Sequence, residues 1–185
     1  RMRSALRMKR ANDTLREQAL FDPLTDLANR RAFEDGIRSS ISKWLEARLP
    51  FSLLLVNVDQ LKAVNSVYGH GVGDRVLVEF GAVVRQASRP NDIAARYSGQ
   101  TFALILPQTT SSEAQAIGQQ LLEGVRQLSI QTDDQRFGVT GSVGVASVTA
   151  DDPDVYAHDI VGRARAALGQ AKQQGKDRLV EQIDR

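Results

Sequence analysis

Apolar residues follow helix-like and strand-like spacings in turn along the chain, and this order predicts a mixed α/β domain. Residues 51–58 (FSLLLVNV) are almost continuously apolar over the length of one strand, as in a strand buried on both faces. Residues 30–48, 74–88, 111–127 and 157–174 place apolar side chains every three or four positions, which predicts helices. The central apolar strand is therefore expected to be covered by helices.

Turn-forming residues separate further strands from these helices. Two short apolar runs, 93–97 and 101–106, flank Ser98-Gly99-Gln100, which predicts a β-hairpin. Residues 137–148 have a strand pattern, and Leu179-Val180 predicts a short last strand. Because strands and helices are interleaved and one hairpin is present, we expect a mixed sheet with helices packed against it.

Two helix boundaries can be predicted from residue type. Ser111 or Ser112 is a candidate N-cap for the helix at 111–127, because a serine hydroxyl accepts a hydrogen bond from the first free backbone N–H groups. Gly175 is predicted to end the helix at 157–174, because glycine adopts the left-handed conformation that ends many helices.

The first 21 residues predict a leader helix that precedes the domain at residues 22–185. No glycine or proline interrupts this leader, and Asp22-Pro23 breaks its pattern. The chain begins with Arg rather than Met, so we expect it to be part of a longer protein. Apolar residues recur in the leader at near-heptad spacing, at Leu6, Met8, Leu15 and Ala19.

Composition excludes several classes of function. The chain has no cysteine and only two histidines, which excludes disulfide scaffolds, thiolate zinc sites and a histidine-rich metal centre. Aromatic residues make up 5% of the chain, too few for a stacking platform, so we expect no nucleic-acid partner. No apolar run approaches the length of a membrane span, and no apolar core follows the basic start, so we expect no signal peptide in these residues.

The charge is unevenly distributed. Residues 1–16 carry six basic side chains and one acidic side chain, a net +5 in a chain whose total is +2, so the rest carries −3. A basic leader suits an anionic partner, but a solvated helix face accounts for it more simply.

Two polar clusters follow the central strand. Asp59 and Lys62 lie just past its end, where a carboxylate suits a metal and an amine suits a phosphate. Asn65 and Asp74, around glycines 69, 71 and 73, offer the donors and acceptors that match a guanine edge. The simpler alternatives are a polar strand end and a glycine-rich loop in which Asp74 caps the next helix.

Several motifs, in order and spacing, resemble the GGDEF family of diguanylate cyclases over roughly residues 20–180. The family condenses two GTP molecules into cyclic di-GMP, with divalent metal, between two facing domains. The resemblance implies a nucleotide-cyclase-like fold with a central, mixed five-stranded sheet flanked by helices. The motifs are residues 22–31 (DPLTDLANRR), 59–65 (DQLKAVN) with 69–74 (GHGVGD), 96–102 (RYSGQTF), 140–146 (TGSVGVA) and 171–176 (AKQQGK).

The resemblance also implies a GTP site and shows where this chain departs from it. Lys62 would contact phosphate, and Asn65, Asp74 and Gly99 would complete the GTP site. The family's signature reads Ser98-Gly99-Gln100-Thr101-Phe102 in this chain.

Asn57 and Gln100 stand where the family places metal-binding acids, and Thr101 stands where it places a catalytic glutamate. An amide brings no negative charge to Mg²⁺, although Asp59 remains. We therefore predict a catalytically inactive domain without a resident metal, with Mg²⁺ only if residual GTP binding occurs.

Arg89-Pro90-Asn91-Asp92 has the RxxD form at the position of the family's inhibitory product site. By resemblance, Arg89 and Asp92 would bind cyclic di-GMP, with Lys172 and Lys176 as supporting basic groups. Arginine donates in a fork to phosphate or guanine, and aspartate accepts from guanine N–H groups. An ordinary Pro-Asn-Asp turn is the alternative.

Four interpretations stay open: a cyclic di-GMP receptor, a GTP-binding regulatory module without turnover, a structural dimerisation or partner-binding module, and a weak cyclase. The resemblance also implies a homodimer formed through the leader, an upstream sensor domain and a downstream phosphodiesterase domain. Because the family uses cytoplasmic GTP, we expect the domain to face the cytoplasm.

Overall fold

The structure, a computed structural model, describes residues 20–133 and 135–182. The predicted leader helix therefore lies outside the described residues, apart from its last two positions. Within the described part of the chain, no helix is long and apolar enough to cross a lipid bilayer.

A five-stranded mixed sheet forms the centre of the domain, in the order β2-β3-β1-β6-β7. The central strand is antiparallel to both of its neighbours, and the last strand is parallel to the one beside it. Two further short strands form a separate antiparallel pair. The strands are β1 (Phe51–Val58), β2 (Ile93–Ser98), β3 (Thr101–Pro107), β4 (Ile130–Gln131), β5 (Arg136–Phe137), β6 (Gly141–Val148) and β7 (Leu179–Glu181).

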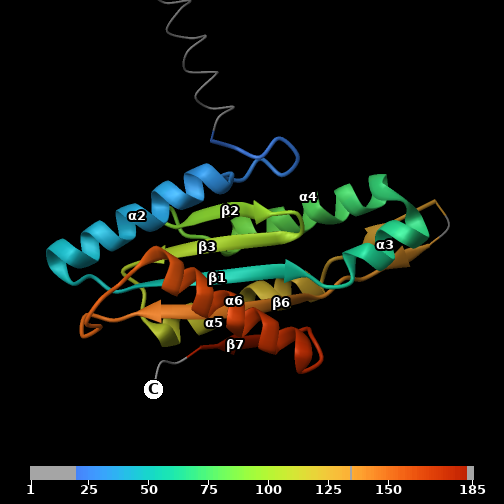
Figure 1. The fold of residues 1–185 in the computed structure, drawn as a ribbon. Helices are drawn as coiled ribbons and strands as arrows, with labels where there is room; N and C mark the ends of the chain where they lie inside the picture. The colour runs from blue at the N-terminus through green and yellow to red at the C-terminus, as the bar shows by residue number, and fades with distance from the viewer. Residues whose placement is uncertain (1–19, 134, 183–185) are drawn as a thin grey trace, which may run out of the picture.

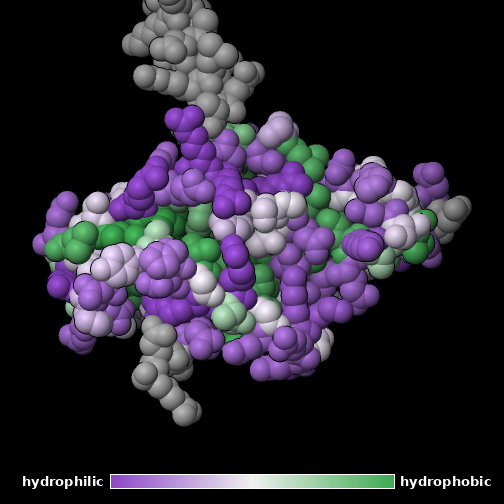
Figure 2. All heavy atoms as spheres, in the orientation of Figure 1, coloured by the Kyte–Doolittle hydropathy of each residue, from purple (hydrophilic) through white to green (hydrophobic). Residues whose placement is uncertain are grey.

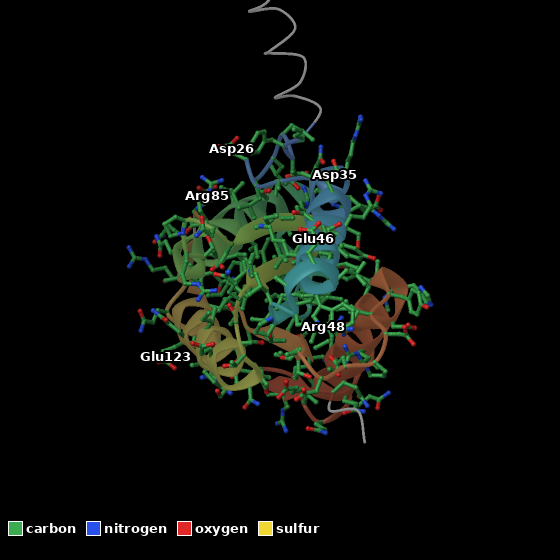
Figure 3. All side chains as sticks on the ribbon, turned by 90° about the vertical axis from the view of Figure 1, so that its left-hand side faces the viewer. Asp26, Asp35, Glu46, Arg48, Arg85 and Glu123 are labelled. Atoms are coloured by element: carbon green, nitrogen blue, oxygen red, sulfur yellow. The ribbon has the colours of Figure 1, made fainter. Side chains whose placement is uncertain are left out.

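Helices cover both faces of this sheet, in two layers that Figure 3 shows on either side of it. Two helices pack on one face, and two longer helices with one short helix belong to the other face (Figure 1). On the first face lie α2 (Arg30–Ala47) and α6 (Ala157–Gln173), and on the second lie α3 (Leu61–Tyr68), α4 (His70–Ala87) and α5 (Ser111–Arg126).

The central strand supplies both hydrophobic cores because successive side chains of a strand point to opposite faces. Leu53 and Leu55 belong to the core beneath α2 and α6, whereas Leu54 and Val56 belong to the core beneath α4 and α5. All eight residues of β1 are buried. On the outside, Figure 2 shows mostly hydrophilic residues, with hydrophobic residues visible in the recesses between them.

The predicted fold class is confirmed, and most predicted elements lie where the pattern placed them. The central strand has the predicted bounds, and the hairpin, the last strand and the helix at 30–48 agree to within a residue or two. Gly175 has a φ of 116°, as a glycine that ends a helix does.

The segment after β1 differs from the prediction. The glycine-rich loop is instead the junction of α3 and α4, and α4 begins at His70, four residues before the predicted start. Gly69, with a φ of 84°, turns the chain directly from one helix into the next. Because Gly69 alone joins the two helices, α4 begins early, and Asp74 lies inside α4 and does not cap it.

Two smaller boundaries also differ. Thr110, rather than Ser111 or Ser112, is the N-cap of α5, and it forms a reciprocal capping box with Glu113. The predicted strand at 137–148 is interrupted, because its first residue pairs with β4 and the long strand begins only at Gly141.

Candidate functional site

Residues 98–102, which we call the signature hairpin, comprise the last residue of β2, the turn at Gly99-Gln100 and the first two residues of β3, and they lie against the end of β1. Gln100 Nε2 donates to the Val58 carbonyl at 3.0 Å and to Asn57 Oδ1 at 3.2 Å. Asn57 Nδ2 donates to Thr101 Oγ1 at 2.9 Å. The three side chains that stand where the resemblance expects acids are therefore linked by hydrogen bonds.

Asp59, the acid that remains, is buried and hydrogen-bonded through both carboxylate oxygens. Its two carboxylate oxygens accept hydrogen bonds from Thr140 Oγ1 at 2.8 Å, Ser142 Oγ at 2.8 Å and the Asp177 backbone N–H at 3.1 Å. Lys176 and Asp177 both adopt the left-handed conformation in the turn after α6. Asp59 thus fixes this strained turn to the sheet, a role that sequence reasoning missed although both hydroxyl residues lie in a quoted motif.

The base of the signature hairpin is tied to the start of the domain. Arg96 donates from Nε to the Gly99 carbonyl at 2.9 Å and from Nη1 to both Asp22 oxygens at 3.2 Å. Asp22 also accepts from the backbone N–H and the hydroxyl of Thr25. Burial raises the pKa of Asp22, but the hydrogen bonds from Thr25 and the charge of Arg96 together outweigh burial and lower the pKa below 3.8.

The predicted guanine-reading residues come together at the junction of α3 and α4. Asn65 Oδ1 is buried and has no hydrogen-bond partner among the described residues. It lies against Gly73, where an added Cβ would be only 1.8 Å from this oxygen, so the close approach needs glycine. Lys62 and Asp74 are exposed on the same two helices.

The RxxD motif forms a closed pair beside a pocket of about 500 Å³. Arg89 donates to both Asp92 oxygens from its side chain, at 2.9 and 3.0 Å, and also bonds Thr109. The Asp92 side chain is 1% exposed and the Arg89 side chain 45% exposed, so Arg89 covers Asp92. The pocket is lined by Arg89 and Asp92 together with Ser40, Lys43, Leu49, Pro50, Phe51, Pro90, Asn91, Pro107 and Gln108.

The structure does not bring Lys172 and Lys176 to this pocket within one chain. Burial lowers the pKa of Lys172, the charge of Asp59 opposes this shift, and the charge of Lys176 adds to it. These lysines therefore lie near Asp59, past the C-terminal end of β1, whereas Phe51 at the other end of β1 lines the pocket. An eight-residue strand separates the two places by roughly 25 Å, so within one chain these lysines do not lie beside Arg89, and their role in binding cyclic di-GMP stays a prediction.

Comparison with known families identifies the family to which this domain belongs. The model described as "Diguanylate cyclase, GGDEF domain" matches residues 19–178 of the chain. The chain belongs to the GGDEF family.

Curated relatives and solved structures agree with this assignment. Diguanylate cyclase A from Treponema denticola is 33% identical over 171 residues, which is 91% of this chain and 46% of that protein. The bifunctional diguanylate cyclase/cyclic di-GMP phosphodiesterase MucR from Pseudomonas aeruginosa is 31% identical over 173 residues, 94% of this chain and 25% of that protein. The chain thus spans less than half the length of these relatives.

Two solved structures extend the likeness to the whole fold. The coiled coil and GGDEF domain of DgcB from Caulobacter crescentus, in complex with c-di-GMP, has a TM-score of 0.91 at 27% identity, over 97% of this chain and 94% of that chain. The diguanylate cyclase SiaD from Pseudomonas aeruginosa, in complex with its activator SiaC, has a TM-score of 0.85 at 34% identity, over 97% of this chain and 68% of that chain.

The metal expected in an active GGDEF domain does not fit the residues of this one. Asn57 and Gln100 bring amides that are already hydrogen-bonded to each other, and both oxygens of Asp59 are engaged by protein donors. No group of three or more His, Asp or Glu side chains in the described residues is arranged to hold a metal ion. Mg²⁺ prefers carboxylate oxygens beside substrate phosphates, and of Asn57, Asp59 and Gln100 only Asp59 is a carboxylate, whose oxygens are held by three protein donors.

Proposed function

We propose that this GGDEF domain has no diguanylate cyclase activity and acts as a cyclic di-GMP receptor in cyclic di-GMP signalling. In phosphoryl transfer, metal ions held by the protein neutralise the charge that develops on the phosphates. The hydrogen-bonded amides of Asn57 and Gln100 supply no such charge, and Thr101 has no basic form at neutral pH. These replacements support the loss of catalysis.

The observation that carries the receptor proposal is the pocket beside Arg89. Its volume of about 500 Å³ falls within the roughly 300–1,000 Å³ of small-molecule sites. Arg89 and Lys43 bring positive charge for phosphates, while the amides of Asn91 and Gln108 suit the edges of a purine. Arg89 Nη1 has no partner among the described residues, so this group is available to a ligand while Asp92 holds the guanidinium in place.

Titration calorimetry with cyclic di-GMP tests the receptor proposal. We expect micromolar or tighter binding to the wild-type chain and at least a tenfold loss for R89A. Because lysine lacks the planar fork of arginine, R89K should also bind more weakly. R38A is the matched control, since Arg38 is an exposed arginine of α2 that does not line the pocket. Unchanged affinity in R89A, or no binding by the wild-type chain at micromolar levels, would refute the proposal.

A turnover assay tests the loss of catalysis separately. The wild-type chain, incubated with GTP and either Mg²⁺ or Mn²⁺, is expected to form no cyclic di-GMP, and an active relative serves as the positive control. Synthesis at a rate comparable to the relative's would show that the amides support metal-dependent catalysis after all.

A second candidate function is the binding of GTP without turnover. The observation that favours it is the buried, unpartnered Asn65 Oδ1 beside Gly73, because such an acceptor is costly unless a ligand donor satisfies it. Lys62, Asp74 and Gly99 would complete this site. Lys172 and Lys176 lie at the same end of the sheet, near Asp59. GTP binding that survives R89A but is lost in N65A would favour this function.

The last proposal concerns the dimer and the neighbouring domains of the whole protein. We propose that the leader forms a homodimer and links an upstream sensor, and that a phosphodiesterase domain follows in a protein that presents this domain to the cytoplasm. The coiled coil named with DgcB and the bifunctional MucR support these two arrangements, because they occur in proteins similar to this chain.

A further inference from the structure

The direction of each hydrogen bond in the signature hairpin is fixed by one backbone group. The Val58 carbonyl can only accept, so the Gln100 side chain must turn its NH₂ group toward it. The second hydrogen of this NH₂ then meets Asn57 Oδ1, which turns the Asn57 NH₂ toward Thr101 Oγ1. The four groups form a chain of donors and acceptors with one consistent orientation.

Because these side chains are buried or partly buried, each polar atom that lost its hydrogen bond would destabilise the fold. Asn57 is 4% exposed, and Gln100 and Thr101 are partly buried. A buried polar atom that loses its partner costs the full free energy of its desolvation. The backbone adds one bond in the same place, since the Val58 N–H donates to the Gln100 carbonyl at 3.1 Å. The hairpin tip is thus attached to β1 through both side chain and backbone.

Carboxylates at the two amide positions would behave in the opposite way. A glutamate at position 100 would present acceptors to both the Val58 carbonyl and the oxygen at position 57. Two carboxylates at these positions would also repel each other unless a cation lay between them. The exchange of two oxygens for two NH₂ groups therefore replaces a repulsion with a hydrogen bond.

We propose that Asn57 and Gln100 are positioning residues that attach the signature hairpin to β1 without any divalent metal. The hairpin keeps one position whether Mg²⁺ is present or absent, and acids at both positions make that position depend on a cation. This inference concerns the hairpin itself and does not require that the chain binds cyclic di-GMP.

Thermal unfolding of the full chain, with and without millimolar Mg²⁺ or Mn²⁺, tests the proposal. The wild-type melting temperature is expected to be unaffected by either metal. Q100E should melt about 3–8 °C lower, because acceptors then face acceptors, whereas Q119E makes the same change on an exposed position of α5 and should shift by less than about 2 °C. T101V, which removes the acceptor for Asn57, should melt lower than T101S, which keeps it.

The double variant N57D/Q100E tests whether metal can take over the role of the two amides. Its melting temperature should be lower than that of Q100E in metal-free buffer, and Mn²⁺ should restore part of the difference. A residue that only fills space would give no such metal dependence. Hydrogen exchange gives a local measure, because the Val58 N–H should exchange roughly tenfold faster in Q100E than in Q119E.

Three outcomes would overturn the proposal: a wild-type hairpin stabilised by metal, a Q100E variant as stable as Q119E, or a metal response absent from N57D/Q100E. A failure of this kind leaves the calorimetry of R89A untouched, since the Arg89 pocket lies at the opposite end of β1. Conversely, a chain that binds no cyclic di-GMP leaves the stability comparison unchanged.

Discussion

At the scale of single residues, small changes of chemistry decide what the site can do. Asn57 and Gln100 have nearly the shape of Asp and Glu, and each differs by one NH₂ group that donates where a carboxylate oxygen would only accept. Asp59 is still an acid, but three protein donors bind its oxygens. An acid counted in the sequence is therefore not the same as an acid available to a metal.

Asp22 gives a pH-dependent prediction at this scale. Its pKa is lower in the folded chain than the usual 3.8, so its contribution to stability is present above about pH 4 and is lost as pH falls through the folded pKa. We expect D22N to lower the free energy of unfolding at pH 7 by about 1–2 kcal/mol, because the bonds to Arg96 and Thr25 weaken. Urea unfolding at pH 7 and pH 3 measures this difference.

The matched control is D26N, because Asp26 lies in the same turn with its side chain 85% exposed. D26N should change stability little at either pH. If the difference between wild type and D22N grew on acidification, the assigned direction of the pKa shift would be wrong.

At the scale of elements, β1 connects the two places where ligands are expected. The segment before its first residue and the turn after β3 line the Arg89 pocket, and the residues at its last positions hold the signature hairpin. All of β1 is buried, so the signature hairpin and the Arg89 pocket lie at the two ends of one strand of the core.

The start of α5 gives a prediction for one element. Thr110 accepts from the Glu113 backbone N–H, and the Glu113 side chain accepts from the Thr110 backbone N–H. We expect T110A to lower the free energy of unfolding by about 1 kcal/mol, because the first turn of the helix loses its cap. Chemical denaturation measures the loss, and T110S, which keeps the hydroxyl, should retain most of the stability. Equal losses in both variants would argue against the capping box.

At the scale of the whole molecule, ligand binding and stability are linked. If cyclic di-GMP binds only the folded chain, its addition at about one hundred times the dissociation constant should stabilise the fold by about 2.7 kcal/mol. This gain corresponds to a rise in melting temperature of several degrees for a chain of this size. Melting curves with increasing cyclic di-GMP measure it. The rise should be the same with EDTA as with Mg²⁺ and should vanish in R89A, and a rise that needed Mg²⁺ would point instead to a metal-dependent nucleotide site.

The sequence alone was sufficient for the local patterns and the family. The apolar run at 51–58, the glycine-bearing turn before Thr101 and the stop at Gly175 depend on residue type and spacing, which short-range sterics and burial translate directly into structure. The amides at Asn57 and Gln100 could likewise be read from the sequence itself. Those features need no knowledge of distant contacts.

Only the tertiary structure decided how those residues are used. It joined α3 directly to α4 at Gly69, engaged Asp59 with a turn more than a hundred residues away, and moved Lys172 to the end of the sheet opposite Arg89. Each of these outcomes depends on groups that are far apart along the chain, and hydrogen bonds and burial between such groups leave no periodic trace in the sequence. The local pattern fixes which groups are present, and the packing of the sheet and its helices fixes which of them remain free to bind a ligand.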